Sequence, residues 1–279
     1  MESKASSKAQ SAKLFAYAIL SVCGVVMIVP FIWMISTSLK ENHLVMSYPP
    51  VWIPNPIKWS NYIEALTAFP FFRYFWNTSY ITVLTIVGVV FTSSLAGYAF
   101  ARMNFAFRNA SFMIVLSTMM IPGQVIMIPI FLLVRDLGWM DSHLSLIVPG
   151  IMSPFGIFLM RQFYLSIPKE LEDAAYIDGC NPLRTFFSIF LPLSKPAIAT
   201  LTVFTFMGTW NSFLWPLILI STKSKQMLTV GLLQFQNMYT TQFNLLMAAT
   251  VLVLLPVFIV YMLAQRYFVE GIAATGIKG

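Results

Sequence analysis

Long stretches without a charged residue separate the Lys, Arg, Asp and Glu residues of this chain. A helix needs about 20 apolar residues to cross the hydrocarbon core of a bilayer, and six uncharged segments reach or approach that length. They are Leu14–Leu39, Tyr74–Ala101, Asn109–Val134, Leu144–Met160, Pro196–Thr222 and Phe243–Gln265. The sequence therefore predicts an all-α polytopic membrane protein with six transmembrane helices.

The composition supports this fold class. Charged residues make up 10% of the chain and hydrophobic residues 58%, and the mean hydropathy is +0.77. A soluble domain carries about 25% charged residues, so an ordinary soluble enzyme and a disordered tail protein are both excluded. The net charge of +7 could indicate nucleic-acid binding, but in a chain this apolar it favours Lys and Arg that hold loops in the cytoplasm.

The Lys and Arg residues predict that both termini are cytoplasmic. With this orientation, eleven of the 17 Lys and Arg residues lie inside, as the positive-inside rule requires. We expect residues 1–12 to form a flexible cytoplasmic tail, 13–265 the transmembrane domain with a cytoplasmic loop at 166–196, and 266–279 a C-terminal tail. The first apolar segment is too long for a signal peptide, whose apolar region spans about 7–15 residues.

The expected spans contain no Asp, Glu, Lys or Arg. Ion-coupled carriers usually place ionisable residues at mid-membrane depth, which argues against proton coupling, although carbonyl and hydroxyl groups could still hold sodium. Energy for uphill transport would then enter from outside the spans.

Sequence motifs for cofactors are missing as well. The segment Gly271–Gly276 approaches a Walker loop, but its lysine stands one place late and no Ser or Thr follows. We therefore expect ATP to bind partner subunits and not this chain. Cys23 and Cys180 fall in a span and a loop, which predicts no disulfide, and two histidines without a Cys/His cluster predict no metal site.

The cytoplasmic loop predicts two short helices joined by a sharp turn. Pro168 suits a first helical turn, and Glu170, Glu172 and Asp173 follow where the helix dipole favours acidic residues. Gly179 can adopt the left-handed conformation that ends a helix. Asn181 and Pro182 then begin a second helix, which we expect to end at Leu191-Pro192. The small side chains of Ala174, Ala175 and Gly179 would let another protein approach, whereas a hairpin that only seals the bundle is an equally good interpretation.

The loop resembles a known motif. Asp173-Ala174-Ala175, three residues, Gly179, nine residues and Ile189-Phe190-Leu191-Pro192 are similar in spacing to the EAA loop of ABC importer permeases, with Asp173 where that family usually has Glu. Other segments are similar to the smaller permease of the maltose-type carbohydrate uptake group: Asn61-Tyr62, Leu95–Arg102, Ile121-Pro122, Ile128-Pro129, Trp210-Asn211 and Gln265-Arg266-Tyr267.

This resemblance implies a function and a set of partners. The chain would be a permease of the prokaryotic cell membrane that moves a sugar by alternating access. Its partners would be a second permease subunit, two ATP-binding subunits that hold ATP and Mg, and an extracytoplasmic sugar-binding protein. The loop would dock on one ATPase subunit through Glu172, Asp173, Ala174, Ala175, Asp178, Gly179, Pro182, Leu183, Ile189, Leu191 and Pro192.

Polar residues within the expected spans are candidates for the sugar pathway. Thr209, Trp210, Asn211 and Ser212 are expected mid-span in the fifth segment, and Gln124 lies in the third. An indole ring can stack on a sugar, and an amide offers both hydrogen-bond donors and acceptors. The same residues could instead hold helices together.

Small residues recur every four positions at Ser93, Gly97 and Ala101. This spacing lets helices approach closely, either within the chain or against the partner permease.

Three other functions fit parts of the sequence. A secondary transporter predicts mid-membrane charges or inverted repeats, and the sequence shows neither. An ABC permease for a non-sugar solute would favour a charged path when its cargo is charged. A membrane scaffold leaves the Gly179 loop unexplained.

Overall fold

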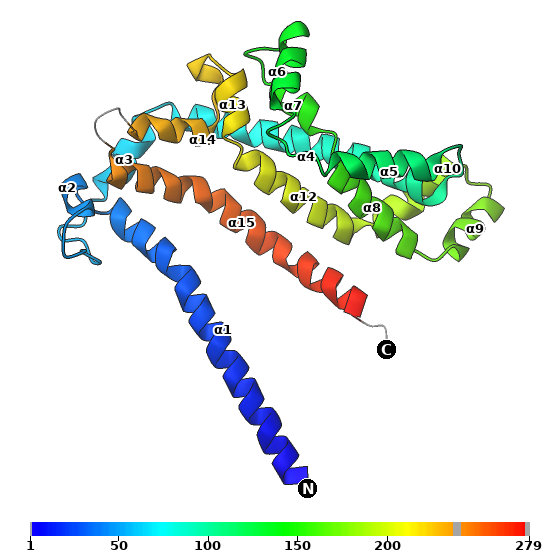
Figure 1. Ribbon diagram of the computed structural model, residues 1–279, viewed down its shortest axis with the longest axis horizontal. Helices are drawn as coiled ribbons and strands as arrows, with labels where there is room; N and C mark the ends of the chain where they lie inside the picture. The colour runs from blue at the N-terminus through cyan, green and yellow to red at the C-terminus, as the bar shows by residue number, and fades with distance from the viewer. Residues whose placement is uncertain (1, 237–240, 277–279) are drawn as a thin grey trace. The chain divides into compact units, whose positions relative to one another are not determined.

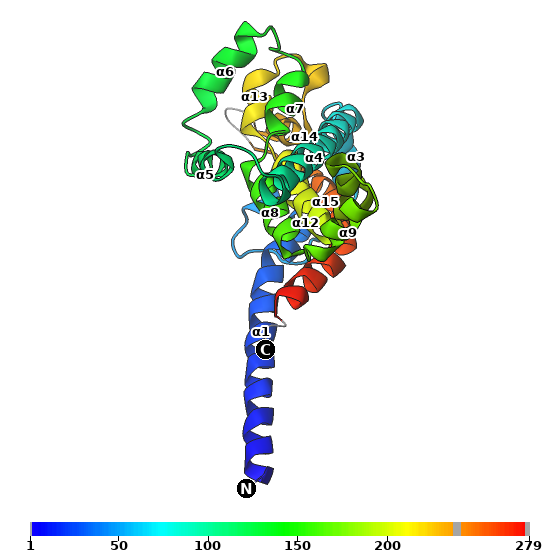
Figure 2. The ribbon, with the colours of Figure 1, turned by 90° about the vertical axis from the view of Figure 1, so that its right-hand side faces the viewer.

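A computed structural model describes residues 2–236 and 241–276 (Figures 1 and 2). Its regular elements are helical, which confirms the all-α fold class. The longer helices are α1 (Glu2–Ser38), α4 (Phe71–Arg102), α5 (Arg108–Thr118), α6 (Met127–Asp136), α8 (Pro154–Ser166), α12 (Lys195–Trp210) and α15 (Phe243–Gly276). The shorter ones are α2 (Asn42–Val45), α3 (Ser60–Thr67), α7 (Leu144–Gly150), α9 (Glu170–Ile177), α10 (Pro182–Thr185), α11 (Leu191–Leu193), α13 (Leu214–Leu219) and α14 (Leu228–Gly231).

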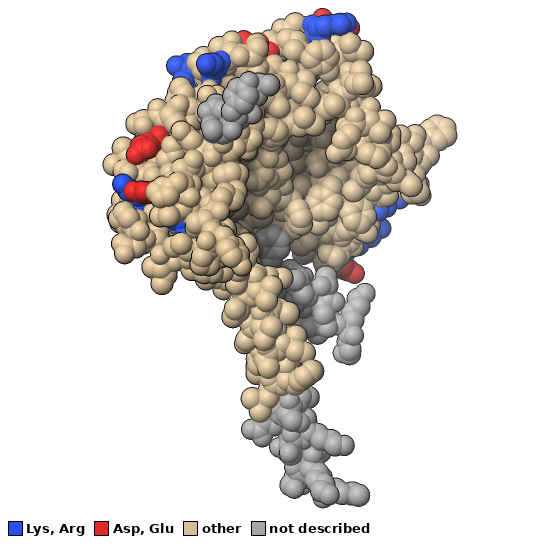
Figure 3. All heavy atoms as spheres, turned by 60° about the vertical axis from the view of Figure 1, so that its left-hand side comes forward, with Lys and Arg blue, Asp and Glu red and all other residues tan. Residues whose placement is uncertain are grey.

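Four helical segments of the described chain are long and apolar enough to cross a membrane. They are Lys13–Ser38, Phe71–Arg102, Leu144–Ser166 and Phe243–Gln265. The helices Pro182–Leu193 and Lys195–Trp210, which meet at a bend of 75°, form a fifth span if they are counted together. Figure 3 shows a face that is largely free of charged side chains, as a lipid environment requires. The structure therefore supports a multi-pass protein but does not confirm the count of six.

The predicted third span is wrong as a continuous helix. A turn that contains Pro122 and Gly123 separates α5 from α6. Proline lacks the backbone N–H that a helix interior needs, and the 11 residues of α5 cover only about 16 Å. Neither helix alone can cross about 30 Å of hydrocarbon.

The predicted fifth span is also interrupted. Helix α12 ends at Trp210, Asn211 caps it, and α13 begins at Leu214. The residues expected at mid-span, from Thr209 to Ser212, therefore lie at the end of a helix.

The two predicted tails share helices with the spans beside them. Helix α1 begins at Glu2, so the backbone of residues 2–12 belongs to it. At the other end of the chain, α15 extends through residues 266–276, and residues 277–279 lie outside the described part.

The chain divides into two compact units, residues 1–69 with 232–254 and residues 70–231 with 255–279. In the first unit, Asn61 is the central polar residue. Its side-chain amide donates to the carbonyl oxygens of Ser38 at 2.8 Å and Lys40 at 2.7 Å, and its Oδ1 accepts from Asn244 Nδ2 at 3.2 Å. One amide thereby ties the end of α1 to α3 and to the start of α15.

In the second unit, α4 packs along α8 and α12 (Figures 1 and 2). Small residues make the contact with α8 close. A Cβ atom at Gly97 would lie 2.7 Å from Met160 Cβ and 2.9 Å from the backbone nitrogen of Arg161, and one at Gly156 would lie 2.3 Å from Ser93 Oγ. Ser93 and Gly97 therefore face α8 within this chain, and Ala101 packs at the edge of the adjoining core.

Replacing Gly97 with alanine is expected to destabilise the α4–α8 contact. The added methyl group collides with backbone as well as side-chain atoms, and overpacking of this kind costs about 1–3 kcal/mol. The thermal unfolding midpoint of the detergent-purified protein should fall. Gly208→Ala in α12 is the matched control, because a Cβ there meets nothing within 4 Å. Equal midpoints for the two variants would contradict the close packing.

Candidate docking hairpin and transport cavity

Residues 170–193 form the docking hairpin, whose first helix is α9. Glu170, Glu172 and Asp173 occupy its first turn, as predicted. The helix ends in a Schellman motif, in which the Gly179 N–H donates to the Tyr176 carbonyl at 3.1 Å and the Cys180 N–H to the Ala175 carbonyl at 2.9 Å. Gly179 has a φ of +78°, so the predicted left-handed turn is confirmed.

The second half of the hairpin begins at Asn181, as predicted. Its Oδ1 accepts from the Arg184 N–H at 2.8 Å, and Pro182 takes the first position of α10. A π-helical turn, Phe186–Phe190, then leads into α11. The predicted end at Leu191-Pro192 is wrong, because helix continues to Leu193. Pro192 lies in the first turn of α11, where its missing N–H leaves no hydrogen bond unmade.

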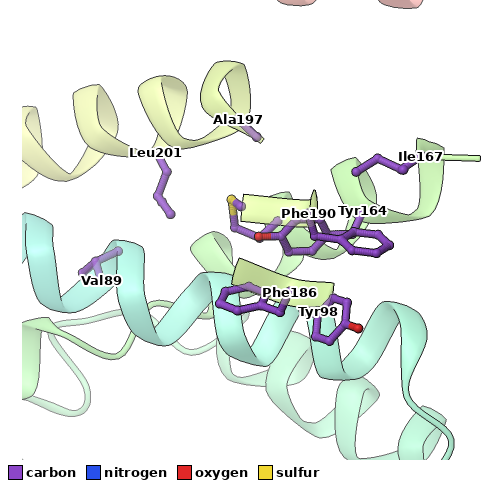
Figure 4. Close-up of a cluster of buried hydrophobic side chains, with 9 residues drawn as sticks. Val89, Tyr98, Tyr164, Ile167, Phe186, Phe190, Ala197 and Leu201 are labelled. Carbon is purple, nitrogen blue, oxygen red and sulfur yellow. The ribbon is translucent and has the colours of Figure 1, made fainter. Parts of the chain in front are cut away.

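Aromatic side chains fix the π-helical turn to the bundle (Figure 4). The ring of Tyr98 lies 5.3 Å from Phe186 and 5.0 Å from Phe190, and the Tyr164 ring lies 5.7 Å from Phe190. All four side chains are buried. The cluster joins α4, α8 and the hairpin in one core.

A buried cation holds the first helix of the hairpin. Arg102, the last residue of α4, pairs with Glu172 at 3.4 Å between Nη1 and Oε2, and both side chains are less than one-tenth exposed. Nη2 donates to the carbonyl oxygens of Tyr164, at 2.6 Å, and Ile167. The sequence analysis named Arg102 only as part of Leu95–Arg102, a segment similar to the maltose-type permease. It missed this contact, which joins residues 70 positions apart.

The hairpin presents some docking candidates and hides others. Asp173, Ala174, Asp178, Gly179, Pro182, Leu183 and Pro192 are exposed, Glu172 and Ala175 are buried, and Ile189 and Leu191 are half-buried. Large exposed apolar side chains that the sequence analysis did not single out lie among them, with Ile177 87% and Phe187 50% exposed. The carboxylate of Glu172 therefore faces the permease itself, whereas Asp173 faces outward.

The surroundings of α9 are polar on one side. A pocket of about 380 Å³ is lined by Ala101, Arg102, Asn104, Arg108, Lys169, Glu172, Asp173 and Tyr176. Partial burial and the nearby Glu172 carboxylate raise the pKa of Tyr176.

A larger cavity of about 770 Å³ lies between α4, the α5–α6 turn, α7, α8, α12 and α13. Hydroxyl groups line it together with apolar side chains, and none of its lining residues in the described chain is charged. The hydroxyl residues are Thr85, Thr118, Ser145, Ser153, Thr205, Thr209 and Ser212. Such walls can exchange hydrogen bonds with a polar, uncharged solute.

The predicted pathway residues divide into two groups. Thr209 and Ser212 line the cavity, whereas Gln124, Trp210 and Asn211 are not among its lining residues. The Trp210 side chain is buried and stacks on Phe206 at 5.3 Å between ring centroids. Asn211 donates from Nδ2 to the Met207 carbonyl at 2.9 Å.

Asp141 clamps two loops near α7 and α13. Its carboxylate accepts from the N–H groups of Ser221 at 3.0 Å and Thr222 at 2.8 Å, from the Thr222 hydroxyl at 2.6 Å, and from Lys225 Nζ at 3.1 Å. These bonds, led by those from Thr222, hold the pKa of Asp141 well below its usual range. The clamp fixes the segment that follows the cavity-lining helix α13.

Residues 88–273 match the family described as binding-protein-dependent transport system inner membrane component. The chain belongs to this family. It is therefore a permease of the ABC importer type and a multi-pass protein of the bacterial inner membrane, and the predicted resemblance is confirmed.

Relatives and a solved structure agree with this assignment. The arabinooligosaccharides transport system permease AraQ of Halalkalibacterium halodurans is 34% identical over 88% of this chain and 86% of its own. The sn-glycerol-3-phosphate transport system permease UgpE of Pectobacterium atrosepticum is 33% identical over 93% and 95%. A crystal structure of a bacterial ABC transporter involved in the import of the acidic polysaccharide alginate matches with a TM-score of 0.81 and 28% identity, over 92% of this chain and 98% of the other.

Asp141→Asn is expected to weaken the clamp at neutral pH. A carboxylate whose pKa is lower in the folded than in the unfolded state stabilises the folded state at every pH above the unfolded pKa. This stabilisation is lost as the pH falls below about 4, toward the lower pKa of the folded state. The thermal midpoint of the variant should therefore lie below that of the parent permease at pH 7, and the two midpoints should converge in acid.

The exposed Asp136, paired with its neighbour Arg135, supplies the control variant Asp136→Asn. A midpoint difference for Asp141→Asn that grows as the pH falls would show that the clamp is not carried by the ionised carboxylate.

Gly179→Val is expected to distort the turn of the docking hairpin. A β-branched residue is strained at positive φ by about 1–2 kcal/mol, and no clash contributes because a Cβ there meets nothing within 4 Å. ATP-driven uptake by the assembled complex should fall, whereas Gly179→Asn, which tolerates this conformation, should retain it. Normal uptake by an assembled Gly179→Val complex would rule out a requirement for the turn.

Proposed function

We propose that this permease moves a neutral sugar or oligosaccharide into the cytoplasm by alternating access. Its partners are a second permease subunit, two ATP-binding subunits that carry ATP and Mg, and an extracytoplasmic sugar-binding protein. The names of relatives support a carbohydrate cargo, because they include permeases for arabinooligosaccharides, lactose and diacetylchitobiose. In this arrangement both termini and the docking hairpin face the cytoplasm.

The observation that carries the proposal is the exposed surface of the docking hairpin. Ile177, Leu183 and Phe187 are all at least half exposed on a hairpin that is itself anchored in the bundle. Ile177 lies outside every candidate span of the described chain, and apolar side chains exposed together on such a surface favour a protein partner. Asp173 stands beside them and can pair with a cationic side chain of the ATPase subunit.

The cavity supports an uncharged cargo. Sugars offer many hydroxyl groups, and Thr205, Thr209 and Ser212 supply matching hydroxyls along one wall. Two similar proteins are named for anionic cargo, glycerol-3-phosphate and alginate. A cation on the path would favour an anionic cargo, and no lining residue of this cavity carries a positive charge.

A reconstituted transporter tests the proposal. The permease would be co-expressed with its partner permease, ATPase subunit and binding protein, and incorporated into proteoliposomes. Radiolabelled lactose, maltotriose, arabinotriose and glycerol-3-phosphate would serve as probes. We expect ATP-dependent uptake of at least one neutral sugar and none of glycerol-3-phosphate.

Variants at Thr209 connect uptake to the cavity. Thr209→Trp should fill part of the cavity and block uptake, whereas Thr209→Ser keeps the hydroxyl and should preserve it. Uptake without ATPase subunits, or uptake of glycerol-3-phosphate alone, would contradict the proposed function.

A further inference from the structure

We propose that Arg102 is the positioning residue that makes the docking hairpin and helices α4 and α8 move as one body. This inference rests on the proposed function, in which the hairpin receives the motion of an ATPase subunit.

One guanidinium group contacts three separate elements. Besides its bond to Glu172 in α9, it donates to the carbonyl oxygens of Tyr164 and Ile167 at the end of α8. Its Cζ atom also lies 5.1 Å from the centre of the Phe190 ring, in the π-helical turn. Arg102 therefore contacts both halves of the hairpin while it belongs to α4.

Burial makes this link hard to break. The side chains of Arg102 and Glu172 are 9% and 8% exposed. If the hairpin moved away from α4, the ion pair between Arg102 and Glu172 would break, and separating a buried pair is unfavourable. Helix α4 is therefore expected to follow the hairpin when an ATPase subunit pulls on the hairpin.

The chemistry of the link requires arginine. The planar guanidinium presents five N–H donors in a fixed fork, so it can serve a carboxylate and two carbonyl groups together. A lysine ammonium keeps the charge but lacks the reach of this fork. Arg102→Lys therefore loosens the link without removing the cation.

Helix α4 connects the hairpin to the cavity and to the far loops. Its 32 residues extend for about 48 Å. Ile81, Thr85 and Val89 on this helix line the cavity. Near its start, Asn77 Nδ2 donates to the carbonyl oxygens of Ser224 at 3.0 Å and Gln226 at 2.9 Å. A displacement of the hairpin at Arg102 would thus move a cavity wall.

The test measures how well ATP hydrolysis is coupled to opening of the cavity. A reporter cysteine replaces Thr209 in a permease that carries Cys23→Ser and Cys180→Ser, assembled with its partner subunits in proteoliposomes. A membrane-impermeant maleimide probes the outer side with and without ATP, and ATP hydrolysis is measured in the same samples.

In the Arg102→Lys complex we expect hydrolysis to continue while the ATP-dependent change in labelling per ATP hydrolysed falls by about 10-fold. Glu172→Gln should lower the same ratio, and it carries the test if the Arg102→Lys complex does not assemble. Arg135→Lys and Asp136→Asn change an exposed ion pair outside the hairpin and the cavity. They are the matched controls and should leave the ratio unchanged.

Three results would overturn the inference. If labelling and hydrolysis fall in equal proportion, or if neither changes, Arg102 has a structural role only. A parent complex that shows no ATP-dependent labelling would overturn the proposed function, and the inference with it.

Discussion

A buried cation must be neutralised where it lies, and this constraint organises one end of the permease. The Arg102 guanidinium is enclosed by the Glu172 carboxylate, two carbonyl groups of α8 and the Phe190 ring. Each of these groups has to stay close for the charge to remain paired. The end of α4, the end of α8 and both halves of the docking hairpin are therefore held together by one residue.

Charged side chains lie near the two ends of α4, and uncharged hydroxyl groups lie beside its middle. Charged networks stand at the two ends of the unit that contains α4, with Arg102 and Glu172 at one end and the Asp141–Lys225 clamp near the other. Between them the cavity has hydroxyl and apolar walls. Fixed charge is expensive in the middle of a bilayer, so a path for a neutral solute needs hydroxyl groups and little else.

Local signals in the sequence predicted the turn of the hairpin correctly, because a glycine at positive φ and an Asn-Pro helix start act within a few residues. The same reasoning placed the end of the second helix too early at Pro192. It also read Asn109–Val134 as one span, although Pro122-Gly123 marked the break. A count of uncharged residues measures how apolar a segment is. It does not detect a proline, whose missing backbone N–H interrupts the helix.

Contacts between distant residues could not be predicted in this way. The sequence offered Glu172 as one more docking carboxylate, because nothing near it in the chain shows that it faces Arg102. Trp210 looked suited to stacking on a sugar, but its ring packs on Phe206. Tertiary packing decides which side of a helix faces the core. In helices that are apolar all round, the spacing of residues along the sequence says little about which side that is.

The most direct test of the account is whether the docking hairpin and α4 move together. Spin labels at Leu171 in the hairpin and Val87 in α4, both exposed and neither a docking candidate, allow their separation to be measured by pulsed electron resonance in the assembled transporter, with native cysteines replaced. The account predicts the same distance with and without trapped ATP, to within about 2 Å, the scale of small helix shifts. A larger ATP-dependent change would show that the hairpin moves independently of the bundle and would contradict the role of Arg102.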